Sequence, residues 1–86
     1  MIDTELSYRD LALLRAVAAG RAQITRSRVP DVFVDGIACC DQVSAGRLAR
    51  SGLIEPSVPA VIGQRVPARL TALGARMLDD GLGLTA

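Results

Sequence analysis

Histidine, lysine and tryptophan are absent from this chain of 86 residues, and its aromatic residues are limited to Tyr8 and Phe33. Without histidine there is no imidazole base for acid–base or nucleophilic catalysis, and no pair of carboxylates takes its place. The glycines are scattered singly, so a glycine-rich nucleotide-binding loop is missing too. The sequence therefore predicts a protein that is not an enzyme and that uses no cofactor.

Cysteine is scarce, and the two cysteines present, Cys39 and Cys40, are adjacent. Two thiolates without any histidine cannot complete a tetrahedral zinc site. Neighbouring cysteines also lack the two-residue spacer of a thioredoxin-type pair. We interpret both as small apolar residues and expect no metal site.

Long apolar runs are lacking, and the N-terminal segment is acidic, unlike the basic and then apolar start of a secretion signal. We therefore expect a soluble, cytoplasmic protein with no membrane partner. With so few aromatic residues, the core must be built from Leu, Val, Ile and Ala, which makes it thin. We expect a single domain over residues 1–86 that gains further buried apolar surface by forming a homodimer.

The net charge of +1 hides an uneven distribution of charged residues. Residues 1–14 carry three acids and one arginine (−2), and residues 77–86 carry two acids (−2). Residues 15–76 hold nine arginines against four acids (+5). A GC-rich genome would account for the preference for arginine, but it does not account for the position of the acids. The layout favours a central region that faces an anionic partner.

The first helix is predicted over residues 7–19. Ser7 followed by Asp10 is a capping-box pattern, and Leu6 with Leu11 is the spacing of a hydrophobic staple. Apolar residues then recur at helical spacing. Gly20 is placed where a left-handed residue would end the helix.

The segment after Gly20 has the pattern of β-structure. Asp35-Gly36 separates Val-Phe-Val from Ile-Ala-Cys, and this dipeptide suits a two-residue turn in which both residues have positive φ. We predict a β-hairpin near 32–40, formed by strands 32–34 and 37–40, with a third strand near 22–25.

A second helix is predicted over residues 41–51, with Asp41 as its N-cap and Gly52 just beyond its end. Gly46 inside this helix costs about 1 kcal/mol relative to alanine, which a close approach to another backbone would offset.

A second hairpin is predicted near 53–70, and a third helix follows it. Prolines confine the first strand to an edge or loop. The alternation from Gln64 onward places Arg65 and Arg69 on the face opposite the apolar residues. Thr71 is a good N-cap for the third helix, and Gly81 is the expected end of that helix.

The stretch "RLARSGLIEP…GQRVPARLTALGARML" resembles the recognition helix, wing and following helix of bacterial winged-helix regulators of the MarR and PadR type. In those families a helix ends in Leu-x-x-x-Gly-Leu-Ile (here residues 48–54), and an arginine-bearing hairpin wing follows. Leu-Thr-x-x-Gly, here residues 70–74, then opens the next helix. The resemblance covers residues 41–78. It implies an α+β winged helix with about three helices, although the predicted hairpin at 32–40 stands where those regulators place a helix.

The resemblance implies a small regulator of transcription, bacterial or from a phage, that binds double-stranded DNA. Helix 41–51 would enter the major groove, and the wing arginines would contact phosphates or the minor groove. The expected DNA-binding residues are Gln42 and Ser44 for bases or phosphate, Arg47 and Arg50 for guanine or phosphate, Arg65 and Arg69 on the wing, and Arg26 and Arg28 on the preceding loop.

Two alternatives remain open from the sequence. Each of these arginines could be an ordinary solvated surface residue, and a charged edge strand also prevents unwanted strand pairing. The whole chain could instead be a winged-helix protein-interaction module, such as a phage or host accessory factor, that binds a protein partner and no DNA. The near-neutral overall charge and the missing helix favour this second function.

Overall fold

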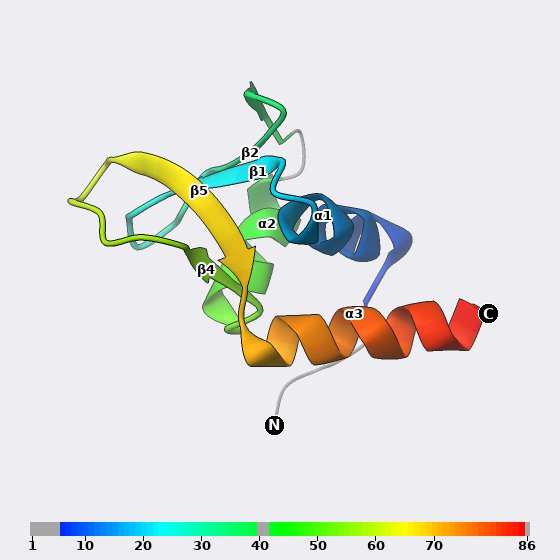
Figure 1. Cartoon of the computed structure of the whole chain (residues 1–86). Coiled ribbons are helices and arrows are strands. Elements are labelled where there is room, and N and C mark those ends of the chain that lie inside the picture. The colour runs from blue at the N-terminus through cyan, green and yellow to red at the C-terminus, as the bar shows by residue number, and fades with distance from the viewer. Residues whose placement is uncertain (1–5, 40–41, 86) are drawn as a thin grey trace.

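The computed structural model describes residues 6–39 and 42–85, with side chains described as far as Asp80 (Figure 1). These residues form three helices and five strands. In chain order they are α1 (Tyr8–Ala18), β1 (Ala22–Thr25), β2 (Val32–Val34), β3 (Ile37–Ala38), α2 (Gln42–Arg50), β4 (Ile54–Pro56), β5 (Arg65–Leu70) and α3 (Ala72–Thr85). The predicted α+β class is confirmed.

The five strands form one antiparallel sheet in the order β3-β2-β1-β5-β4. Ile24 in the central strand lies directly opposite Val32 on one neighbour and Val66 on the other. All three side chains are buried and belong to one core together with Leu14 of α1 and Leu48 of α2. The core is aliphatic, as the composition predicts.

Helix α1 begins where the capping box predicts. The backbone N–H of Asp10 donates to Ser7 Oγ at 3.1 Å, and the backbone N–H of Ser7 donates to Asp10 Oδ2 at 3.0 Å. Gly20 follows the helix with φ of +77°, the left-handed conformation expected of a glycine at this position. The observed bounds lie one residue inside the predicted ones at each end.

The hairpin predicted near 32–40 is confirmed, and so is the third strand at 22–25. Asp35 (φ +53°) and Gly36 (φ +80°) both have positive φ, as a tight turn of this kind requires. Strand β3 ends at Ala38, so it is shorter than the predicted 37–40. Cys39 still donates its backbone N–H to Val32 O, and Cys40 lies outside the described residues.

Helix α2 ends at Arg50, one residue before the predicted end at 51. Gly52 has φ of +76°, and its N–H and that of Leu53 donate back to the last turn of the helix. The predicted N-cap, Asp41, lies outside the described residues. Strand β5 alternates as expected: Val66 and Ala68 are buried, and the arginines beside them are exposed.

The prediction that Gly81 ends the third helix is wrong, because α3 continues to Thr85. A glycine ends a helix only when its backbone turns left-handed, and Gly81 is not among the residues with positive φ. Inside a helix it merely lowers stability by about 1 kcal/mol relative to alanine. The start of α3 is as predicted, since Thr71 Oγ1 accepts from the backbone N–H of Gly74 at 3.0 Å.

A close backbone approach, which would have offset the cost of Gly46, is found at Gly74 and not at Gly46. A Cβ atom at Gly74 would lie 2.0 Å from the carbonyl oxygen of Leu53, whereas one at Gly46 would meet only the end of the Arg50 side chain, at 3.1 Å. The same turn of backbone is bonded twice to Thr71, whose N–H donates to Leu53 O and whose Oγ1 bonds to Gly52 O. Gly74 therefore lets α3 dock on the segment that joins α2 to β4.

We expect Gly74→Ala to lower the free energy of unfolding by about 2 to 3 kcal/mol, because a methyl group there overlaps backbone that cannot move aside. Gly46→Ala is the matched control. Its methyl group meets a flexible side chain, and it should leave stability unchanged or raise it by up to about 1 kcal/mol. Urea denaturation of the two variants measures both effects, and equal losses would contradict this account.

Candidate nucleic-acid interface

The outward face of α2 is formed by Val43, Arg47 and Arg50, which recur at helical spacing and are all exposed. Ala45 and Leu48 on the opposite side are buried in the core. The helix contains two arginines and no acidic residue. Its exposed face is therefore basic with one aliphatic residue.

Arg47 forms an ion pair with a fully buried carboxylate. Its Nη2 lies 2.6 Å from Oδ2 of Asp10, whose side chain is 0% exposed. The same oxygen accepts the backbone N–H of Ser7, so one carboxylate caps α1 and holds α2. Asp10 Oδ1 has no hydrogen-bond partner among the residues that the structure describes. The Arg47 side chain is 49% exposed, so part of its guanidinium group remains accessible from outside.

Gln42, which we expected to read a base, is engaged within the chain. Its Oε1 accepts the Val32 N–H at 3.0 Å, and its Nε2 donates to Val32 O at 3.0 Å and to Cys39 O at 2.8 Å. These bonds tie the first turn of α2 to the β2–β3 hairpin. Contact with an adenine would require breaking them. Ser44 is half-buried and borders a hollow between α1 and β2, so it is also poorly placed for a base contact.

Residues 57–64 connect β4 to β5 and are called the wing tip below. Hydrogen bonds join them to the β1–β2 loop, residues 26–31. Arg26 N donates to Gln64 O at 3.1 Å, Gly63 N donates to Arg26 O at 2.8 Å, and Arg26 Nη1 bonds to Ala60 O. Gln64 also closes the tip on itself through its backbone and side chain, which both bond to Val61. Figure 1 shows the wing tip and the β1–β2 loop projecting from the same end of the molecule.

The remaining predicted arginines differ in what they contact. Arg28 is exposed on the β1–β2 loop, and Arg50 is exposed on α2; neither makes a side-chain hydrogen bond or ion pair with any described residue. Arg65 covers the ring of Phe33, with its Cζ 4.5 Å from the ring centre. Arg69 pairs with Glu55 at 2.9 Å. Arg65 and Arg69 lie on the sheet face that points away from the core.

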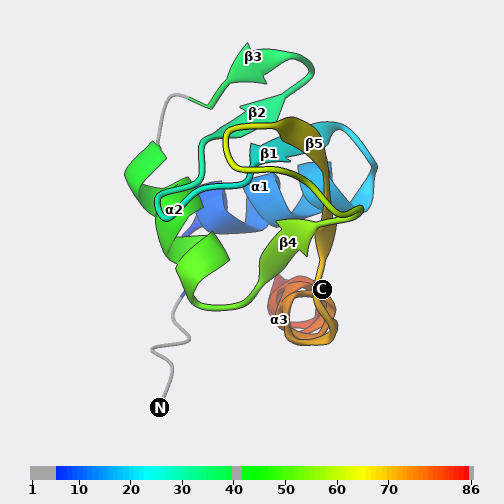
Figure 2. The same cartoon turned by 90° about the vertical axis from the view of Figure 1, so that its left-hand side faces the viewer.

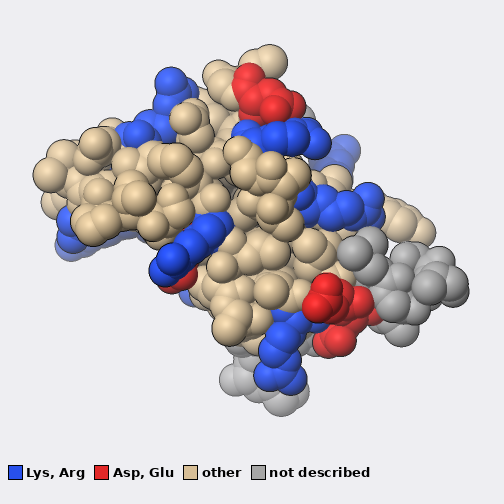
Figure 3. Space-filling view, viewed as in Figure 1, with Lys and Arg blue, Asp and Glu red and all other residues tan. Residues whose placement is uncertain are grey.

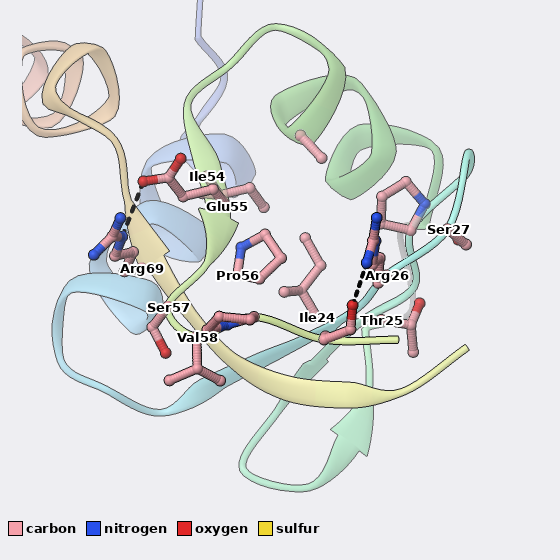
Figure 4. A pocket seen from close by; sticks show the side chains of 14 residues that line it. Ile24, Thr25, Arg26, Ser27, Ile54, Glu55, Pro56, Ser57, Val58 and Arg69 are labelled. Atoms are coloured by element: carbon pink, nitrogen blue, oxygen red, sulfur yellow. Dashed lines mark hydrogen bonds and ion pairs between the residues drawn. The ribbon is translucent and has the colours of Figure 1, made fainter. Parts of the chain in front are cut away.

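A hollow of about 640 Å³ lies between α2, β4, the β1–β2 loop and the wing tip (Figure 4). Ile24, Ile54 and Ala49 form its apolar side, and Arg26 lies at one edge with its guanidinium group bonded to Ala60 O. Figure 2 shows α2 on one flank and the wing crossing in front of the sheet. The structure thus brings α2, the loop and the β4–β5 hairpin around one hollow. Arg69, paired with Glu55, also borders this hollow, whereas Arg65 lies outside it over the ring of Phe33.

The basic side chains do not form one continuous patch in the view of Figure 3, where they are spread singly over the surface with a few acids among them. Sequence reasoning missed five exposed aliphatic residues in or next to this region: Val43 on α2, Val29 on the β1–β2 loop, and Val58, Val61 and Ile62 in the wing tip. The apolar character of these residues was visible, but without a fold nothing separated them from core residues. It also missed the pairing of Asp10 with Arg47, because residues 37 apart carry no local signal.

No model of a known protein family, no curated protein and no solved structure matches this chain. No described helix is both long enough and apolar enough to cross a membrane. Within residues 6–39 and 42–85, no group of three or more potential metal-ligating side chains comes together.

We expect Arg47→Ala to lower the free energy of unfolding by about 1 to 3 kcal/mol, since it leaves the buried Asp10 carboxylate without its charged partner. Arg50→Ala, on the same exposed face, should change stability by less than about 0.5 kcal/mol. Urea denaturation monitored by circular dichroism measures both values. A loss at Arg50 as large as that at Arg47 would show that the ion pair does not hold the helices together.

Proposed function

We propose that this protein is a winged-helix, double-stranded-DNA-binding protein and not an enzyme, with α2 as its recognition helix. The observation that carries the proposal is the outward face of α2. There, Arg50 pairs with no residue in 6–39 or 42–85 and Arg47 is partly accessible, and α2 as described (Gln42–Arg50) has no acidic residue to repel phosphate. A major groove of B-DNA admits one helix, and arginine is the side chain that most often contacts guanine or phosphate.

The order and pairing of the elements support the winged-helix assignment. Strands β1, β5 and β4 lie side by side, α2 leads directly into β4, and β4 and β5 form an antiparallel hairpin that would be the wing. The β2–β3 hairpin occupies the place in the chain where the related regulators have a helix. Gln42 bonds that hairpin to the start of α2, so the hairpin supports the recognition helix in place of the missing helix.

The structure narrows the set of residues proposed to touch DNA. Arg50 and Arg28 are the strongest, because both are exposed and unpaired among the described residues. Arg26 and Arg47 are partly committed to contacts that hold the wing and α2 in place. Arg69 borders the hollow but is paired with Glu55, and Arg65 would reach phosphates only if the duplex extended around the sheet. We assign Gln42 a supporting role.

A second candidate function is favoured by the exposed aliphatic residues Val43, Val61 and Ile62 and by the number of arginines paired within the chain. This is the protein-interaction module without DNA binding. The two candidates differ in salt dependence: contacts with phosphate weaken steeply as salt rises, whereas apolar contacts between proteins do not.

We also propose that the protein acts in the cytoplasm as a transcription regulator and as a homodimer, because the aliphatic core is small for a stable monomer. Sedimentation equilibrium tests the dimer directly. A mass of one chain at every concentration, with and without duplex, would contradict it.

We expect wild-type protein to bind duplex of random sequence at low salt, with an affinity that falls as salt is raised. The double variant Arg28→Ala/Arg50→Ala should bind more weakly and reduce the slope of log affinity against log salt by about two. The matched control is Arg15→Ala/Arg76→Ala, which removes the same charge from α1 and α3. Fluorescence anisotropy of a labelled duplex measures both. If the control lowers the slope as much, the proposed interface is wrong.

A further inference from the structure

The wing tip exposes three large aliphatic side chains, Val58, Val61 and Ile62, and the last two lie where the hairpin turns. Ile62 is 82% exposed and Val61 is 69% exposed. Val29, on the adjoining β1–β2 loop, is exposed as well. A solvated turn needs no such residues, because polar side chains would serve it better. Their presence indicates that this tip is covered when the protein is bound to its partner.

The tip is held in one conformation before any partner arrives. Gly63 has φ of +85°, Gln64 bonds to Val61 through both its backbone and its side chain, and Arg26 bonds to the tip at three points. A braced turn loses little conformational entropy on binding, so the two aliphatic side chains can be inserted into a partner at low cost.

The charge around the tip favours an anionic partner. Residues 26–31 and 57–64 together contain two arginines, Arg26 and Arg28, and one aspartate, a net charge of +1. A narrow, braced turn that carries aliphatic side chains and is flanked by arginines matches the arrangement by which proteins enter the minor groove. There, arginines lie along the phosphates and an apolar side chain wedges between base pairs.

We infer that Ile62, supported by Val61, inserts as an apolar wedge into the minor groove and bends the duplex. This inference rests on the DNA binding proposed above and adds a mechanism to it. The wing then contributes by deforming DNA, while α2 contributes contacts in the major groove. Sequence preference would arise in part from flexible pyrimidine–purine steps, which kink most easily.

The test uses Ile62→Ser in the full chain, with Ile37→Ser as the matched control. Ile37 is 73% exposed on β3, at the opposite edge of the sheet from β4, so it undergoes the same change at similar exposure. The probe is a duplex of about 20 base pairs with a central TA step and a dye at each end, whose energy transfer rises when the DNA bends. Thermal melts confirm that both variants fold.

We expect wild type and Ile37→Ser to raise energy transfer equally. Ile62→Ser should bind about tenfold more weakly, with the salt slope unchanged and the bend lost. Full bending and affinity in Ile62→Ser would overturn the wedge while leaving DNA binding intact. Absence of any duplex binding by wild type would overturn both proposals. Binding of wild type to anionic phosphatidylglycerol vesicles but not to duplex would assign the tip to a lipid surface and overturn the wedge.

Discussion

The buried carboxylate of Asp10 is the contact on which the arrangement of α1 and α2 depends. One oxygen accepts both the Ser7 backbone N–H, which starts α1, and the Arg47 guanidinium, which fixes α2 against it. An unpaired charge at a fully buried position would be costly, so the pairing strongly favours the one orientation of α2 in which Arg47 reaches Asp10. The same contact leaves Arg50 exposed, because it sets which side of α2 faces solvent.

A second contact joins the segment between α2 and β4 to the start of α3. The backbone at Gly52 and Leu53 ends α2, accepts both bonds from Thr71 and touches Gly74 at a distance that only glycine permits. The Gly-Leu-Ile and Leu-Thr-x-x-Gly segments are thus two sides of one contact, although they are separated by the wing. This contact lets the wing project while both of its ends stay in the core.

Local signals predicted most of the fold. The capping box at Ser7, the Asp35-Gly36 turn and the alternation along β5 depend on neighbouring residues, and each is observed. The end of α3 was predicted wrongly, because a glycine can either end a helix or lie inside it, and the sequence does not give the backbone angles that decide between the two. The candidate site was harder to predict. Whether an arginine is paired depends on residues far away in sequence, as Arg47 and Arg69 show. Gln42 has an amide side chain of the kind that contacts bases. In the structure this amide instead bonds to the backbone of Val32 and Cys39.

We propose that α2 and the wing tip together form a surface that binds double-stranded DNA. Backbone amide spectra of isotope-labelled protein, recorded during titration with a short duplex, test it most directly. We expect the largest shifts in α2, in residues 26–31 and at residues 61–64, while β3 and the exposed side of α3 stay unchanged. Shifts confined to α3 or to the β2–β3 hairpin, or no shifts even at low salt, would contradict it.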